Sequence, residues 1–124
     1  MRPGIDLVSL ERMRVLLERT PRFAERYFTQ KEQEYFGEGP ARTERVAAAF
    51  AVKEATSKAM GTGFSGYSPR DIELSHKETG EPVVTLHGNA LEIFNAKGYK
   101  KISCSISHTD EVAAAIVIIE GGSD

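Results

Sequence analysis

The chain has 124 residues, of which 27% are charged and 40% are hydrophobic, and its formal net charge is -2. This length suits one domain, residues 1–124, with a modest core. The small net charge argues against a general nucleic-acid binder, and no apolar run is long enough to span a membrane. Because the N-terminus lacks the apolar segment of a signal peptide and Cys104 is the single cysteine, we expect a cytoplasmic protein.

The first element that the sequence predicts is a short strand over Gly4 to Ser9. The period of two in a strand puts Ile5 and Leu7 on one face. Asp6 and Val8 then lie on the other face, so a carboxylate interrupts an otherwise apolar strand. Such a carboxylate is costly unless it is paired or binds a cation. Asp6 therefore needs a partner, and Glu54 together with a hard metal ion would serve.

Helical signals follow the strand. Ser9 suits the N-cap of a helix that continues to Thr20, where Thr20 can cap and Pro21 can open the next helix. Two short helices are expected after this point. Thr29 and Glu32 have the spacing of a capping box, which marks the start of the second of them.

An Ala-rich segment predicts one long helix, from about Glu44 to Met60, with Gly61 as its C-cap. Glu54 and Lys58 lie one turn apart and share a face. By spacing alone an exposed ion pair is the commoner explanation of such residues. Lys53 points about a hundred degrees away from Glu54. Lys53 either belongs to the same site as Glu54 and Lys58 or forms a structural ion pair.

The second half of the sequence predicts most of the sheet. Strands are expected at residues 72–75 and 83–86, and a helix at residues 91–97. Residues 102–107 and 112–119 are expected to form a closing hairpin, and the continuous apolar run of its second strand favours burial on both faces. The sequence thus predicts an α+β fold, in which a mainly antiparallel sheet packs with the long helix and shorter helices.

Separate motifs together carry a family resemblance. They are Gly4-Ile5-Asp6-Leu7, residues 22–26, residues 50–63, Asp71-Ile72-Glu73, Gly80-Glu81-Pro82 and residues 105–108. In order and spacing the chain resembles the holo-acyl-carrier-protein synthases, the small bacterial type of 4'-phosphopantetheinyl transferase. The resemblance implies the fold of that family. It also implies transfer of the 4'-phosphopantetheine arm of coenzyme A to a serine of apo acyl carrier protein, with release of adenosine 3',5'-bisphosphate.

The resemblance implies a catalytic site as well. Asp6 and Glu54 match the family's metal-binding carboxylates, and Mg2+ is the expected ion because it favours oxygen ligands. Lys58 matches the last lysine of the Lys-Glu-Ala-x-x-Lys motif, where it would bind phosphate or protonate the leaving group. Glu54 or a metal-bound water is then the candidate base. Coenzyme A is expected to contact the remaining residues of the family pattern, which are Gly61, Gly63, Pro82, Ser107 and His108.

One position departs from the family pattern. Many members carry Arg immediately before the aromatic residue of the long helix, where it helps to bind the 3'-phosphate of coenzyme A, but this chain has Ala49. Arg45 lies one turn earlier and is our candidate for that contact. His76 and His87 match no catalytic motif. Cys104 lies in the apolar register of its strand, which is typical of a small buried hydrophobe rather than a nucleophile.

Arginines crowd the N-terminal part of the chain. Such a cluster attracts an acidic partner, although interleaved glutamates equally suit a solvated helix face. The resemblance implies acyl carrier protein as the partner of Arg12, Arg19, Arg22 and Arg26, and a homotrimer with each coenzyme A site at a subunit boundary. Two other interpretations stay open. One is a non-catalytic oligomeric module that binds carrier protein or nucleotide, and the other is a different metal-dependent phosphoryl-transfer enzyme.

Overall fold

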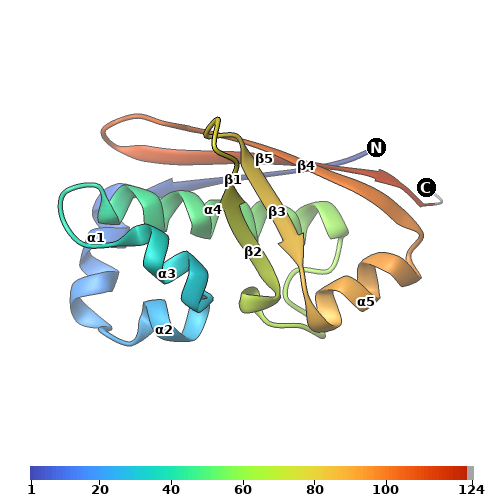
Figure 1. The fold of residues 1–124 in the computed structure, drawn as a ribbon, viewed down its shortest axis with the longest axis horizontal. Coiled ribbons are helices and arrows are strands. Elements are labelled where there is room, and N and C mark those ends of the chain that lie inside the picture. The colour runs from blue at the N-terminus through green and yellow to red at the C-terminus, as the bar shows by residue number, and fades with distance from the viewer. Residues whose placement is uncertain (123–124) are drawn as a thin grey trace.

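Helix α4 (Arg42–Met60) occupies the middle of the molecule, and the other elements pack around it (Figure 1). The structure is a computed structural model that describes residues 1–122. The predicted antiparallel sheet is divided in two: one sheet has the strand order β1-β5-β4, and the other pairs β2 with β3. The remaining elements are β1 (Arg2–Ser9), α1 (Leu10–Arg19), α2 (Phe23–Tyr27), α3 (Gln30–Phe36), a 3-10 turn (Pro69–Asp71), β2 (Ile72–His76), β3 (Pro82–Leu86), α5 (Gly88–Ala96), β4 (Tyr99–His108) and β5 (Val112–Gly121).

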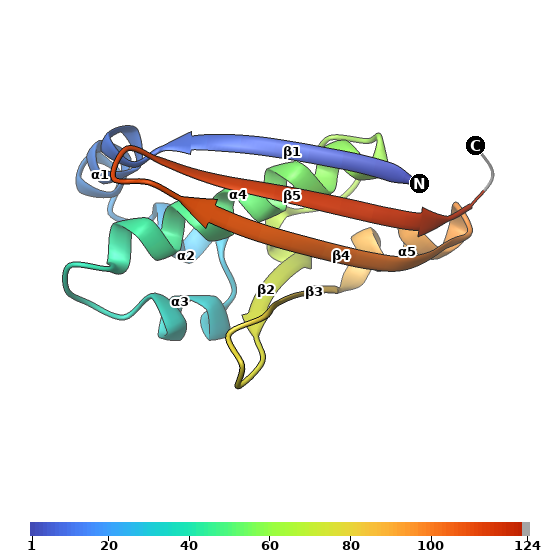
Figure 2. The ribbon, with the colours of Figure 1, turned by 90° about the horizontal axis from the view of Figure 1, so that it is seen from above.

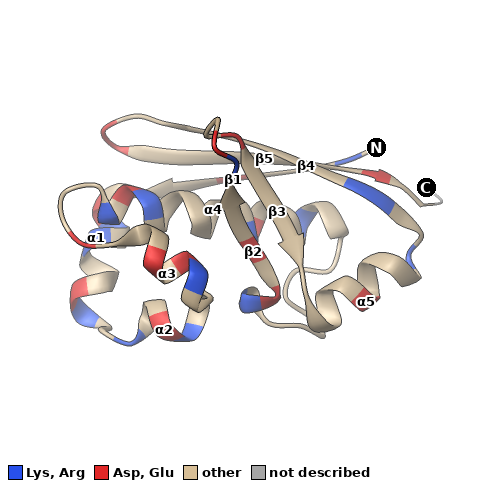
Figure 3. Cartoon of the chain, in the orientation of Figure 1, with Lys and Arg blue, Asp and Glu red and all other residues tan. Residues whose placement is uncertain are grey.

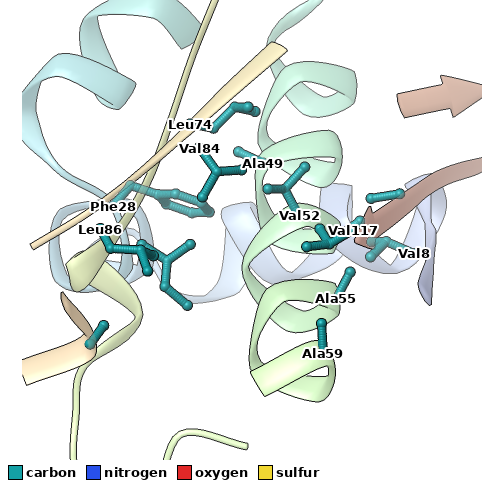
Figure 4. Packing of buried hydrophobic residues seen from close by; sticks show 14 of the residues in the cluster. Val8, Phe28, Ala49, Val52, Ala55, Ala59, Leu74, Val84, Leu86 and Val117 are labelled. Atoms are coloured by element: carbon teal, nitrogen blue, oxygen red, sulfur yellow. The ribbon is translucent and has the colours of Figure 1, made fainter. Parts of the chain in front are cut away.

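Strand β1 lies directly against α4 because a glycine lets the two backbones approach. A Cβ atom on Gly4 would lie 2.0 Å from the carbonyl oxygen of Ala55, a distance that no side chain tolerates. Ala55 and Ala59 are small, and both are buried at this contact. Figure 4 shows them on the side of α4 that faces Val8 and Val117 of the three-stranded sheet. The alanine-rich sequence of α4 thus serves close packing.

Capping residues set several helix ends as the sequence predicts. The Ser9 side chain accepts a hydrogen bond at the start of α1, and Thr29 and Glu32 form both bonds of a capping box at the start of α3. Gly61 ends α4 in the left-handed conformation, with φ of 78°. The prediction that Thr20 caps and Pro21 opens the next helix is wrong. Thr20 is the C-cap of α1, and α2 begins at Phe23 with Arg22 as its N-cap.

Strand β5 is buried on one face only, which corrects the prediction of burial on both. Val117 and Ile119 face α4 and are fully buried, whereas Ile116 is 41% exposed. Ile5 and Leu7 of β1 lie on the same outer face and are 60% and 66% exposed. Figure 2 views this face and shows β1, β5 and β4 side by side in front of α4. The apolar run of β5 therefore includes a face that this chain leaves uncovered.

A buried ion pair joins α4 to α3 and β2. Lys53 Nζ donates to Glu32 Oε1 at 2.8 Å, to the Pro69 carbonyl at 2.9 Å and to the Ile72 carbonyl. Glu32 Oε2 accepts from the Leu74 amide at 3.0 Å. Burial lowers the pKa of the Lys53 ammonium, and the Glu32 carboxylate opposes that effect. Of the two roles that the sequence left open for Lys53, the structure supports the structural ion pair.

Replacing Lys53 with methionine should lower the free energy of unfolding by about 3–5 kcal/mol, because the Glu32 carboxylate would remain buried without a counter-charge. Urea denaturation monitored by circular dichroism measures the change. Lys77→Met is the matched control, since the pair between Lys77 and Glu81 is more than half exposed on both sides. Equal denaturation midpoints for the two variants would contradict the assignment.

Candidate functional site

The three predicted catalytic residues come together where β1 meets α4. Asp6 and Glu54 line one cleft of about 520 Å³, together with Arg12 and Phe50. Lys58 lies one turn beyond Glu54, and its Nζ is 3.0 Å from Asp6 Oδ1. The cleft thus has two carboxylates on its wall and an ammonium beside them.

Asp6 has a partner in the chain that the sequence analysis did not foresee. Its side chain is only 16% exposed, and Lys58 supplies the compensating positive charge. Lys58 also donates to the Ile5 carbonyl at 2.9 Å, so its head group is held against β1. Lys58 therefore supplies a partner that Asp6 was expected to need, and a metal ion shared with Glu54 stays a prediction. Within residues 1–122, no group of three or more His, Cys, Asp or Glu residues is placed to hold a metal ion.

Glu54 is held by a tyrosine that sequence reasoning missed. The Tyr27 hydroxyl donates to Glu54 Oε1 at 2.9 Å, and the Tyr27 ring stacks with Phe23 and Phe50. Burial raises the pKa of Tyr27 well above its ordinary value, and the negative charges of Glu54 and Asp6 add to the effect. No spacing rule marks Tyr27, because an aromatic residue in a short helix is typical of core packing.

A second group of predicted residues lines another pocket. Arg45, Pro82 and His108 surround a space of about 200 Å³, next to Tyr35. The Arg45 guanidinium lies 5.1 Å from the centre of the Tyr35 ring, and Nη1 donates to the Tyr35 carbonyl at 3.3 Å. His108 Nε2 lies 3.1 Å from Glu44 Oε1. The wall of this pocket therefore carries the Arg45 guanidinium and the Glu44 carboxylate from α4 and the His108 imidazole from the end of β4.

Helix geometry separates the two groups. Arg45 and Glu54 are nine residues apart, which is about two and a half turns, so they point to opposite sides of α4. Arg45 and Lys58 are also about 20 Å apart along the helix axis. The two groups of residues therefore line separate pockets of this chain.

The structure does not bring Gly61, Gly63 and Ser107 into either pocket. Gly61 and Gly63 have positive φ angles of 78° and 57° and lie beyond the C-terminal end of α4, far from Arg45. Ser107 is exposed on β4 and, by strand alternation, points to the opposite face from His108. It therefore belongs to the outer face of the three-stranded sheet.

Comparison with known proteins decides the family. The sequence model of the 4'-phosphopantetheinyl transferase superfamily matches residues 2–117. The chain belongs to this superfamily. It is 43% identical over 119 residues to holo-(acyl-carrier-protein) synthase of Caldanaerobacter subterraneus subsp. tengcongensis, which covers 96% of this chain and 94% of the relative. The Clostridium novyi synthase is 45% identical over 117 residues, or 94% of this chain and 85% of the relative.

Solved structures confirm the predicted α+β fold of the superfamily. The holo-(acyl-carrier-protein) synthase of Neisseria meningitidis superposes with a TM-score of 0.89 at 30% identity, over 96% of this chain and 97% of that one. The Helicobacter pylori synthase, solved in complex with coenzyme A, superposes with a TM-score of 0.85 at 31% identity, over 95% of this chain and 99% of that one. Among the described residues, none of the helices has the length and apolarity needed to cross a membrane.

The arginines that the family resemblance assigned to the carrier protein are exposed. Arg12 lines the cleft of Asp6 and Glu54, and Figure 3 shows further positive segments on α1 and α2. Arg14, which was not assigned, is engaged by Glu11 at 2.6 Å and by Glu18 at 2.8 Å. The exposed positions are Arg12, Arg19, Arg22 and Arg26, of which Arg22 lies 3.5 Å from Glu25.

Two residues without a predicted catalytic role are now placed. His76 stacks on Tyr35 at 4.5 Å and lines the pocket of Arg45. Burial and the Arg45 charge lower the pKa of His76. Burial raises the pKa of the Cys104 thiol to about 11, which leaves little thiolate at neutral pH. This finding agrees with the interpretation of Cys104 as a packing residue.

Proposed function

We propose that this phosphopantetheinyl transferase modifies a serine of an apo acyl carrier protein. The serine oxygen forms a bond to the phosphorus of the 4'-phosphopantetheine arm. The bond to adenosine 3',5'-bisphosphate breaks, and the serine proton is taken up. The observation that carries the proposal is the cleft in which Asp6, Glu54 and Lys58 meet, in a chain related over almost its whole length to holo-(acyl-carrier-protein) synthases.

We assign a Mg2+ site to Asp6 and Glu54. Mg2+ in phosphoryl-transfer sites is commonly held by one or two carboxylates, with waters and substrate phosphates as the other ligands. The residues fit, because both carboxylates line one cleft. Asp6 uses Oδ1 toward Lys58 and Glu54 uses Oε1 toward Tyr27, so a second oxygen of each carboxylate lies outside these two contacts. When bound, the ion would neutralise charge on the diphosphate.

Lys58 and Glu54 supply the phosphate binding and the proton transfer that the reaction needs besides the ion. The Lys58 side chain is 53% exposed beside Asp6, where its ammonium can bind a phosphate oxygen or protonate the leaving group. Glu54, or a water beside it, accepts the proton of the serine hydroxyl. Both groups lie on the same side of α4, so one substrate in the cleft would reach both.

The coenzyme A site is completed in our proposal by a second copy of the chain. Arg45 would bind the 3'-phosphate, with Pro82 and His108 lining the same pocket. Because this pocket lies on the far side of α4 from Glu54, we propose that the two groups meet at a subunit boundary of a homotrimer. The other assigned coenzyme A contacts are Gly61, Gly63 and Ser107.

The outer face of the three-stranded sheet supports this assembly. Ile5 and Leu7 of β1 and Ile116 of β5 are all exposed there, and apolar patches of this kind commonly mark protein interfaces. Ser107 lies on the same face. A boundary across this face would bury the apolar residues and bring Ser107 to the interface.

Transfer can be measured directly. Apo carrier protein mixed with coenzyme A, Mg2+ and the chain should gain roughly 340 Da, the mass of the arm, in a mass spectrum. Asp6→Ala and Glu54→Ala should fold but lower the turnover number by orders of magnitude, because each removes a group that acts in the transition state. Glu92→Ala, at an exposed position of α5, is the control and should match the parent.

No mass gain with the parent protein would favour the non-catalytic binding module instead. Near-normal turnover of either cleft variant over a range of Mg2+ concentrations would remove that residue from the metal site.

We further propose that the exposed arginines of α1 and α2 dock the carrier protein. Arg12 connects this surface to the reaction, because it lines the cleft of Asp6 and Glu54. An acidic partner held along these arginines would have its serine near the carboxylates. Exposed charges of this kind mainly set the rate of encounter and its sensitivity to salt.

Reversal of Arg12 and Arg22 to glutamate should raise the KM for carrier protein and flatten its dependence on ionic strength, because the attraction is screened by salt. The KM for coenzyme A should change little. Steady-state assays at low and high salt measure both constants. Lys100→Glu with Lys101→Glu makes the same change of charge on β4 and serves as the control. An unchanged KM for carrier protein at low salt would rule out these arginines as the docking surface.

A further inference from the structure

We propose that Tyr27 is a positioning residue, whose hydroxyl holds the Glu54 carboxylate in the orientation that binds the divalent ion. This inference rests on the proposed metal site and adds a residue that no family motif in the sequence marks. The hydrogen bond from the Tyr27 hydroxyl to Glu54 Oε1 is 2.9 Å long. It joins α2 to α4, two elements that are separated in sequence.

The Tyr27 ring is itself held in place. It stacks at 5.0 Å with Phe23 from α2 and at 5.1 Å with Phe50 from α4, and it meets Phe64 edge-on at 6.4 Å. Phe50 lies one turn before Glu54 on the same side of α4. Phe28 is a fourth neighbour at 5.3 Å. The hydroxyl therefore reaches Glu54 from a ring that four aromatic neighbours contact, rather than from a freely rotating surface side chain.

The chemistry of the two groups fixes the direction of the hydrogen bond. An ionised carboxylate only accepts, so the Tyr27 hydroxyl is the donor and Glu54 is the acceptor. A donor on Oε1 occupies that oxygen and limits rotation of the carboxylate. The second oxygen, Oε2, would then be the one available to an ion in the cleft.

Such support matters for Mg2+ in particular. The ion demands nearly regular octahedral geometry and tolerates little movement of its ligands. Side chains that orient the ligands of a metal are important in general, and their loss typically costs 10–100-fold in metal affinity or activity. Tyr27 meets the structural requirement because it contacts Glu54 directly and does not line the cleft.

The variant Tyr27→Phe separates positioning from packing, because it keeps the ring and removes only the hydroxyl. Mn2+ serves as the probe, with the free ion followed by electron paramagnetic resonance in the presence of coenzyme A. We expect the Kd for Mn2+ to rise by about tenfold or more, while the melting temperature and the KM for carrier protein stay near those of the parent. Tyr99→Phe removes a buried hydroxyl that contacts the Met60 carbonyl and should leave the Kd for Mn2+ unchanged.

The outcomes are distinct. A Kd for Mn2+ within twofold of the parent in Tyr27→Phe overturns the role of Tyr27 and leaves the proposed transferase intact. An equal rise of that Kd in Tyr99→Phe also overturns it, because the effect would then be general. If the parent itself binds no Mn2+, the assignment of the ion to Asp6 and Glu54 fails, and the role of Tyr27 fails with it. Loss of carrier modification by the parent would instead refute the proposed function.

Discussion

The buried contact between Lys53 and Glu32 determines how α4 is turned about its own axis. A lysine ammonium in the core is costly without its partner, so Lys53 must face α3 and β2. Glu54 then points about 100° away and Lys58 about 140° away. These directions carry Glu54 to Tyr27 and Lys58 to β1. The orientation of the proposed catalytic side chains thus follows from an interaction that takes no part in the chemistry.

A second constraint brings β1 to the same place. Gly4 lets the strand lie on the alanine face of α4, and Asp6, two residues later, faces α4 on the same side of the strand. The resulting cleft uses one side of the helix, while Arg45 and His108 meet on another. The outer face of the sheet stays apolar and exposed. The two groups of proposed site residues therefore lie in separate pockets of one chain, and our proposal joins them through a second copy.

Local signals in the sequence predicted most elements to within three residues of their ends. This is because helix caps and hydrophobic periodicity depend only on residues that are close in sequence. The capping-box spacing predicted the role of Glu32 at the start of α3. The contact of Glu32 with Lys53 depends instead on how the helices pack, which no local pattern predicts. Similarly, the i,i+4 rule placed Glu54 beside Lys58, whereas Tyr27 reaches Glu54 from 27 residues away. The uncovered face of β5 was also missed, because an apolar run does not distinguish the core of a chain from an interface.

We propose that one chain carries two halves of a site, and that another copy of the chain completes each half. This proposal is tested by co-expressing an Asp6→Ala chain with an Arg45→Ala, His108→Ala chain and measuring carrier-protein modification by the mixed oligomer, whose composition native mass spectrometry verifies. Each variant alone should transfer poorly. The mixed oligomer should regain activity, because some boundaries combine an intact cleft from one chain with an intact pocket from its neighbour. Verified mixing with no recovery would contradict the claim.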